Sequence, residues 1–244
     1  MLIEIAVFNL ESAIAACIAG AHRIELCSAP AEGGLTPSFA TMKLARKYVK
    51  IPIHVMIRPR EGDFCYSEKE YESMLLDISA SKIAGMDGVV LGILNPYGTV
   101  DLERTRILAE AASPMNVTFH RAFDMARDQY EALETVVRTG CARILTSGGQ
   151  PTAPEGIEKI AALTKIAGNR ISIMPGSGIK LSNIKQVAEM SCATEIHLSA
   201  RTFVHGKMKF KQPAITMWNS IPVSDVDLQL PDILMIEKIV HLFE

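Results

Sequence analysis

The sequence has little of what marks a secreted, membrane or nucleic-acid-binding protein. It has 5 cysteines among 244 residues, an odd number without CxxC spacing, so neither a disulfide framework nor a cysteine-based zinc site is predicted. Its 25 basic and 27 acidic residues give a net charge of −2, which argues against nucleic acid as a partner. The start of the chain has no basic segment followed by a long apolar run. No signal peptide or membrane span is therefore predicted, and a cytoplasmic location is expected.

Short apolar, β-branched segments recur along the chain, each followed by helical periodicity, with starts roughly 20–35 residues apart. Eight predicted strands result: Leu2–Ala6, Arg23–Leu26, Ile53–Ile57, Gly88–Leu91, Asn116–Phe119, Arg143–Leu145, Ile171–Met174 and Glu195–Leu198. Eight β-then-α units favour an α/β fold of the TIM (β/α)8 barrel type. The alternative, an open doubly wound sheet, carries a Gly-rich fingerprint after its first strand, and residues 7–11 contain no glycine.

The pattern predicts one domain. Residues 1–201 are expected to form the barrel core, and residues 202–244 to complete it rather than fold separately. Residues 202–224, which include Pro213 and Pro222, are expected to be irregular. A last helix is predicted over residues 232–243, after Pro231.

Polar side chains at the carboxyl ends of the predicted strands are the candidates for chemistry, because barrel active sites lie at that end. Glu25 and Cys27 share one face of the second strand. A buried, unpaired charge is costly, so Glu25 is expected to meet Arg58 inside the barrel, either as a structural ion pair or as part of a site. Glu25, His120 and Asp124 are the candidate catalytic acids and bases.

Arginines and two Gly-rich turns gather at the same predicted end. Guanidinium groups bind carboxylates and phosphates, and free N–H groups at helix starts favour anions. An anion site is therefore predicted from residues that share this end of the barrel: Arg58, Arg60, Arg121, Thr146, Ser147, Gly148, Gly149, Gly176, Ser177, Gly178, His197 and Arg201.

Several motifs resemble one known family. They are RIELC at 23–27, EGGLTPS at 32–38, MIRPR at 56–60, GDF at 62–64, TFHRAFD at 118–124, LTSGG at 145–149, and EIH with SAR within 195–201. Together they resemble the CutC family, in order over residues 1–201. The resemblance implies a TIM barrel, a cytoplasmic location, a homodimer or higher homo-oligomer, and an assignment to copper homeostasis and copper binding.

The sequence departs from that family in its first strand. Members commonly carry EVCVDS there, whereas residues 4–9 read EIAVFN, so Ala6 stands where the family has a cysteine. In the family that cysteine is paired with the one matching Cys27 as a Cu(I) site. The resemblance therefore implies Cys27 as a metal ligand, with Met56 or His120 as further ligands. Because Cu(I) prefers soft thiolate and thioether ligands, the loss of one thiol predicts weaker copper binding.

Three functions are therefore open at the level of sequence. The first is copper binding or trafficking, which the resemblance favours. The second is an enzyme acting on a small anionic metabolite, of which a phosphorylated one is an example. The third is a sensor that binds such an anion without reaction. The four arginines at the mouth favour an anion over a cation. A metal site and a phosphate site are also compatible, because a metal ion can bridge carboxylates and phosphate.

Overall fold

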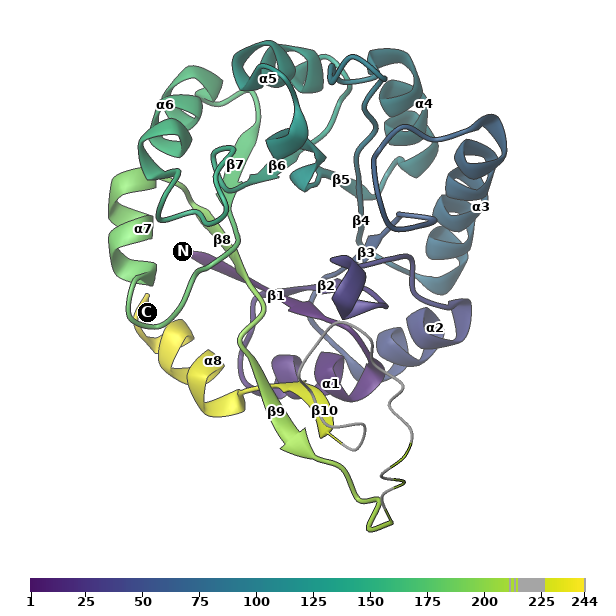
Figure 1. The fold of residues 1–244 in the computed structure, drawn as a ribbon, viewed down its shortest axis with the longest axis vertical. Coiled ribbons are helices and arrows are strands. Elements are labelled where there is room, and N and C mark those ends of the chain that lie inside the picture. The colour runs from purple at the N-terminus through teal and green to yellow at the C-terminus, as the bar shows by residue number, and fades with distance from the viewer. Residues whose placement is uncertain (211, 213, 215–226, 244) are drawn as a thin grey trace.

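The structure is a computed structural model that describes residues 1–210, 212, 214 and 227–243. Strands and helices alternate through most of the chain (Figure 1). In order they are β1 (Leu2–Val7), α1 (Leu10–Ile18), β2 (Arg23–Leu26), η1 (Pro30–Glu32), α2 (Phe39–Tyr48), β3 (Ile53–Met56), α3 (Glu68–Ala84), β4 (Gly88–Leu91), α4 (Leu102–Ala112), β5 (Asn116–Phe119), η2 (Arg121–Met125), α5 (Gln129–Val137), β6 (Arg143–Thr146), α6 (Ile157–Ala167), β7 (Ser172–Pro175), α7 (Ile184–Ser191), β8 (Glu195–Leu198), β9 (Arg201–His205), β10 (Asp227–Pro231) and α8 (Ile233–His241).

Strands β1 to β8 form one parallel sheet in the order β7-β6-β5-β4-β3-β2-β1-β8. In Figure 1 the strands form a ring with the helices outside it, and β7 lies against β8. The predicted TIM barrel is therefore confirmed. None of the described helices is long and apolar enough to cross a membrane.

Local sequence sets the ends of the helices. Helix α3 begins with a capping box, in which Ser67 and Glu70 each accept from the other's backbone N–H, and it ends at Gly85 with φ +83°. Such a box satisfies two N–H groups at a helix start, and glycine adopts positive φ without a steric penalty.

The C-terminal segment differs in part from the prediction. Residues 201–205, expected to be mostly irregular, form β9 and pair antiparallel with β10, and Pro231 ends β10 rather than opening a helix. Pro213 and Pro222 lie outside the described residues. The predicted last helix is α8, which Asp232 caps, and its Ile236 and Ile239 are buried in the same apolar cluster as the barrel helices.

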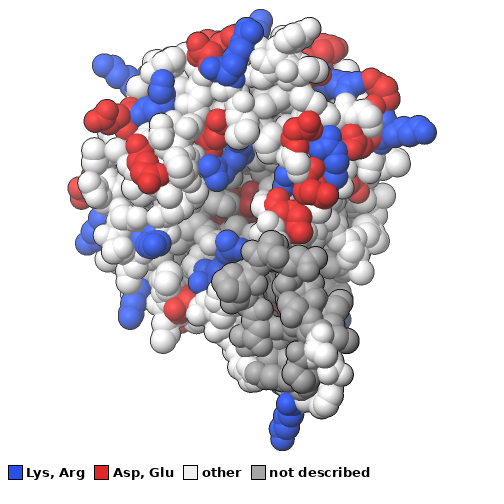
Figure 2. Space-filling view, viewed as in Figure 1, with Lys and Arg blue, Asp and Glu red and all other residues white. Residues whose placement is uncertain are grey.

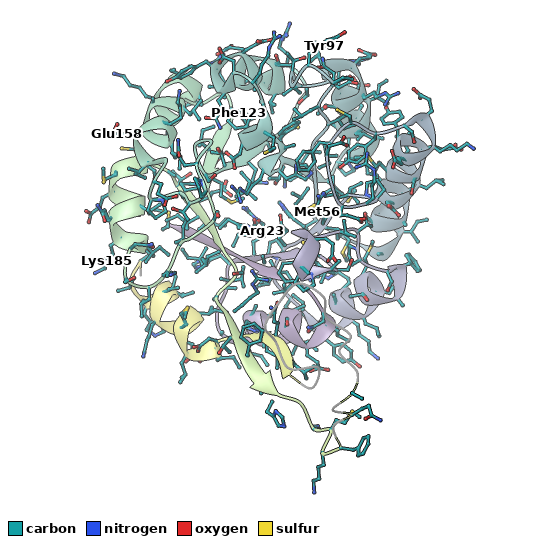
Figure 3. The ribbon with its side chains drawn as sticks, viewed as in Figure 1. Arg23, Met56, Tyr97, Phe123, Glu158 and Lys185 are labelled. Carbon is teal, nitrogen blue, oxygen red and sulfur yellow. The ribbon has the colours of Figure 1, made fainter. Side chains whose placement is uncertain are left out.

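The two faces of the barrel strands have opposite characters. Apolar residues such as Ile3, Ile5 and Ile24 face the helices and form the main core. The alternate residues face the inside of the ring, where Figure 3 shows Arg23 and Met56. Many of these inner residues are buried and polar: Glu4, Arg23, Glu25, His54, Arg58, Thr118, His120 and Arg143. Since barrel interiors are usually packed with branched apolar side chains, this interior is the place to look for function.

Candidate functional site

A closed network of ion pairs fills the amino-terminal half of the barrel interior. Arg23 binds both Glu4 and Glu195, and Arg143 Nε donates to Glu195 at 3.0 Å. Arg143 also donates to the hydroxyl of Thr118 at 3.2 Å. Glu4, Arg23 and Arg143 were not among the predicted site residues, although charged residues at inward-facing positions of predicted strands were a usable signal.

His197 lies between two buried carboxylates. Its Nδ1 is 2.7 Å from Glu4 Oε1 and its Nε2 is 3.8 Å from Glu25 Oε2. Burial lowers the pKa of His197, but the charges of Glu25 and Glu4 together outweigh this effect and hold the pKa above its ordinary value. Burial raises the pKa of Glu25 above its ordinary value, and the positive charge of His197 only partly offsets this rise. The Cys27 thiol donates to Glu25 Oε2 at 3.5 Å, and burial and the Glu25 charge raise its pKa well above normal.

The predicted Glu25–Arg58 ion pair is wrong. The Arg58 guanidinium instead donates to three backbone carbonyls, those of Glu32 at 2.6 Å, Gly34 at 3.1 Å and Gly62 at 3.2 Å. It also lies 5.2 Å from the centre of the Phe64 ring. These contacts belong to loops, which the strand pattern does not place. The Nε atom of Arg58 is buried and has no partner among the described residues.

His120 is buried, and its predicted role as an acid or base stays a prediction. Its Nδ1 accepts from the backbone N–H of Ala122 at 3.1 Å, so the proton is assigned to Nε2. Burial and the charge of Arg58 lower the pKa of His120 to about 3. The Nε2 atom is buried without a partner among the described residues. The imidazole therefore presents one N–H into the barrel at neutral pH.

Two glycines of β4 and its following loop make room for the buried histidines. A Cβ at Gly92 would lie 2.6 Å from the His120 ring, and one at Gly88 would lie 2.4 Å from the His54 ring. Such distances are closer than real Cβ contacts, so a side chain at either position would displace a histidine. The signal that could have found these positions is the spacing of four between Gly88, which begins a predicted strand, and Gly92, which directly follows it on the same face.

The turn after β6, a predicted anion site, already holds the carboxylate of Asp124. Asp124 is 6% exposed in its side chain and accepts from Thr146 Oγ1 at 2.5 Å, Ser147 N at 3.0 Å, Gly149 N at 3.1 Å, Gln129 Nε2 at 3.3 Å and Arg121 Nε at 2.8 Å. Gly148 N donates to the Thr146 hydroxyl at 2.9 Å. The chain therefore supplies its own carboxylate to this turn, and a catalytic role for Asp124 stays a prediction.

The turn after β7 is tied to the β6–α6 loop. Gly176 N donates to the carbonyl of Thr146 at 2.9 Å, and Ser177 Oγ donates to the carbonyl of Pro151 at 2.9 Å. Ser177 and Gly178 both have positive φ, and a Cβ at Gly178 would meet Thr152 at 2.5 Å. This turn is packed, and an anion-binding role for its residues stays a prediction.

The four predicted arginines differ in how their charge is balanced. Arg60 binds Glu70 at 2.7 Å and Asp63 at 2.9 Å, and Arg121 binds Asp124. Arg201, exposed on β9, donates to Gln229 and lies over the Phe8 ring. Figure 2 shows acidic and basic side chains interspersed around the centre of this face. Among the described residues, Arg58 is the buried arginine without a carboxylate partner.

Two sulfur side chains meet beside the Glu25 carboxylate. Cys27, Met56 and Val90 form a small buried cluster with Phe8 against it. A Cβ at Gly34 would lie 3.2 Å from Cys27 Sγ and 3.6 Å from Met56 Cε, so both side chains border one point. One thiol and one thioether are donors that fit Cu(I), and Ala6 contributes no third sulfur.

Comparison with known proteins gives matches over most of the chain. A sequence model of the CutC family matches residues 1–202. A CutC protein of Mesorhizobium japonicum is 47% identical over 219 residues, covering 90% of this chain and 85% of the relative. The "Copper homeostasis protein cutC homolog" of Homo sapiens is 44% identical over 232 residues, covering 95% and 85%.

Solved structures agree with the observed barrel. The putative copper homeostasis protein CutC of Streptococcus agalactiae has a TM-score of 0.78 at 34% identity, and the match covers 82% of this chain and 98% of that protein. The aldolase QR15 has a TM-score of 0.62 at 15% identity, covering 81% and 90%. At that identity the second likeness concerns the fold alone.

Proposed function

Since this chain belongs to the CutC family, we propose that it binds a small anionic metabolite inside the carboxyl-terminal half of its barrel. Arg58 and His120 supply the two hydrogen-bond donors. The observation that carries this proposal is that Arg58 Nε and His120 Nε2 are both buried and lack an acceptor among the described residues. Each buried polar group left without a partner destabilises the fold by about 1–3 kcal/mol. A ligand with several acceptor oxygens would remove this destabilisation by accepting from both donors.

The two donors follow β3 and β5, the strands on either side of β4. Ile57 donates to Val90, and His120 donates to Leu91, so the positions that follow β3, β4 and β5 stand side by side. The Phe64 ring lies against both residues, because its centre is 5.2 Å from the Arg58 guanidinium carbon and 5.0 Å from the centre of the His120 ring. We expect a small carboxylate or phosphate, which carries several acceptor oxygens, to accept from both donors.

The charge of Arg58 favours an anion over a neutral ligand. Its three carbonyl partners orient the guanidinium but carry no net charge. A buried cation without a counter-ion is unstable relative to a paired one. His120 stays neutral, so it adds a hydrogen bond without adding to the burial of charge. Acid–base chemistry by Glu25 on the bound anion stays a prediction.

A thermal-denaturation screen at low salt tests the proposal, with inorganic phosphate, sulfate and small carboxylic acids as probes. A ligand at about 100 times its Kd stabilises the fold by about 2.7 kcal/mol. Arg58→Gln and His120→Phe should reduce that stabilisation. Arg60→Gln is the matched control, since Arg60 lies in the same loop but is already paired with Glu70 and Asp63. A screen without any anion effect, or an effect that Arg58→Gln leaves intact, would contradict the proposal.

Cu(I) binding is the second candidate function, because Cys27 and Met56 border one point and two relatives carry copper homeostasis names. Titration against a Cu(I) competitor probe is the test. Cys27→Ser and Met56→Leu should weaken binding, Ala6→Cys should tighten it, and Cys141→Ser, which alters another buried thiol, should leave it unchanged. Stoichiometric tight binding that survives Cys27→Ser would exclude this ligand set.

A further inference from the structure

We propose that the amino-terminal end of the barrel holds a second binding site, which takes a neutral heterocyclic amide of about the size of a nucleobase. The site is a cavity of about 450 Å³. It lies at the end opposite the mouth, because residues that line it stand at or just before the starts of β1 to β6 in turn: Leu2, His22, Pro52, Asp87, Asn116 and Arg143. The inference goes beyond the anion proposed for the mouth and does not depend on it.

Three buried polar side chains line the inner part of this cavity. Arg23, His54 and Arg143 are 3%, 2% and 8% exposed, and all three border the cavity. Figure 3 shows Arg23 inside the ring of strands. A concave space with a few fixed polar groups is the usual form of a small-molecule site, so these three residues are the candidates for recognition.

Arg23 and His54 have hydrogen-bonding capacity that the protein itself does not use. Arg23 binds Glu4 through Nε and Glu195 through Nη2, whereas its Nη1 has no acceptor in the described part of the chain. Neither ring nitrogen of His54 makes a hydrogen bond with a described residue, and Nδ1 is buried. Since unmet buried polar groups cost free energy, a ligand that supplied an acceptor to Arg23 and a partner to His54 would stabilise this end of the barrel.

The His54 ring is held in place by Gly88. A Cβ at Gly88 would lie 2.4 Å from Cδ2 of the ring and 2.5 Å from its Nε2. The ring therefore occupies the space that a side chain at residue 88 would need, which restricts its rotation. A group that is already fixed loses little conformational freedom when a ligand binds.

Charge at this end favours an uncharged ligand. Two guanidiniums and two carboxylates balance one another in this layer, those of Arg23, Arg143, Glu4 and Glu195. His54 adds no charge at neutral pH, because burial lowers its pKa to about 4. The carboxylate of Asp87 at the rim is bound by Arg46 at 2.8 Å. An ionic ligand would bring a charge without a counter-charge into a buried space, which is costly.

The remaining lining selects a flat ring with an amide edge. Pro52, Met86, Pro114 and Met115 give the cavity apolar walls, and thioether side chains adapt to the faces of a ring. A neutral imidazole has one N–H donor and one bare nitrogen acceptor. An amide has one carbonyl and one N–H, so it can pair with His54 in either tautomer and still offer a carbonyl oxygen to Arg23.

NMR of protein labelled at its methionine methyl groups tests the proposal, because methionines mark both ends of the barrel. Uracil and hypoxanthine are the probes. The signals of Met86 and Met115 should shift, whereas that of Met56, toward the mouth, should not, and Met→Leu variants assign the three signals. Pyrimidine and purine, the same rings without a carbonyl group, are the matched control ligands and should shift Met86 and Met115 little. Orotate, which is uracil with a carboxylate, should bind more weakly than uracil.

Calorimetric titration of variants with uracil locates the site, and one ligand per chain is expected. His54→Phe keeps a ring but removes both nitrogens, and should lower the affinity about tenfold. Asn116→Trp adds bulk at an exposed residue that lines the cavity, and should weaken binding by narrowing it. Thr194→Trp is the matched control, since Thr194 is an exposed residue just before β8. Arg58→Gln should leave uracil binding intact, so failure of the anion proposal is distinguishable.

Four results would overturn the proposal. They are shifts confined to Met56, equal binding of uracil and pyrimidine, tighter binding of orotate than of uracil, and an affinity unchanged in both His54→Phe and Asn116→Trp. Unchanged Met86 and Met115 signals with both probes would also overturn it, because that is the result expected of a cavity that holds only water.

Discussion

Removing the Asp124 carboxylate gives the most direct test of how the β6 turn is held together. In Asp124→Ala the hydroxyl of Thr146, the N–H groups of Ser147 and Gly149, and the Arg121 guanidinium lose their shared acceptor. Hydrogen bonds to a charged group contribute about 1.5–3 kcal/mol each, but the turn regains some water on truncation. A buried donor left without an acceptor costs about 1–3 kcal/mol, so a loss of about 3 kcal/mol is expected for the several donors of this turn.

Urea denaturation with and without formate or acetate measures this loss and its cause. A small carboxylate that fills the space left by the side chain should stabilise Asp124→Ala, by about 1.4 kcal/mol at ten times its Kd, and should do nothing to the wild type. Asp128→Ala is the matched control. Asp128 also caps backbone N–H groups, those of Tyr130 and Glu131, but it is exposed and leaves no enclosed space.

The reasoning would be refuted by a loss below about 1 kcal/mol in Asp124→Ala, because donors that easily re-solvated would not need this carboxylate. Equal rescue of Asp128→Ala by acetate would point to a general salt effect. In either case the β6 turn would again be open to an external anion, as the sequence predicts.

Three further predictions concern the barrel interior. Glu4→Ala should cost about 3–5 kcal/mol in denaturant unfolding, since it strips Arg23 of one partner, and Glu4→Met with Arg23→Met should recover much of the loss. Burial lowers the pKa of His54 to about 4, below the unfolded value of about 6.5. The stabilisation that comes from burying His54 in its neutral form is therefore complete above pH 6.5, and roughly 3 kcal/mol of it is lost as the pH falls toward 4. Urea denaturation of His54→Gln at a series of pH values should show a smaller loss of stability in acid. Gly92→Ala should destabilise by about 1–3 kcal/mol through overlap with His120, and should weaken any anion-induced rise in Tm.

Most of the fold follows from the sequence because parallel strands and their crossover helices carry strong periodicity. Helix α3 also carries its own start and stop signals in Ser67 and Gly85. Strand β9 was missed because its partner β10 begins more than twenty residues later, so that pairing leaves no local pattern. A long-range edge pair of this kind depends on tertiary contacts rather than on propensity.

The sequence predicted which residues lie at the mouth of the barrel, but not which residues their side chains contact. Strand alternation correctly turns Glu25 inward, but the capture of Arg58 by the Glu32 and Gly34 carbonyls depends on loop geometry that periodicity does not encode. The same holds for Asp124, whose donors come from the next strand along. Residue type and strand end therefore locate a barrel site, while the role of each side chain follows only from its contacts.

The distribution of unmet polar atoms is the strongest argument that this interior serves a ligand. Toward the amino-terminal end the charges of Glu4, Arg23 and Glu195 satisfy one another, and His54 lines a cavity of about 450 Å³ with room for water. Toward the mouth, Arg58 Nε and His120 Nε2 are donors without acceptors among the described residues. Among the described residues His54 Nδ1 also lacks a partner, and water in the cavity that His54 lines would supply one. Buried donors without acceptors cost free energy that a purely structural network would avoid. The open end is the one at which barrels of this type bind their substrates, and a copper ion on two sulfur atoms would leave both donors unmet.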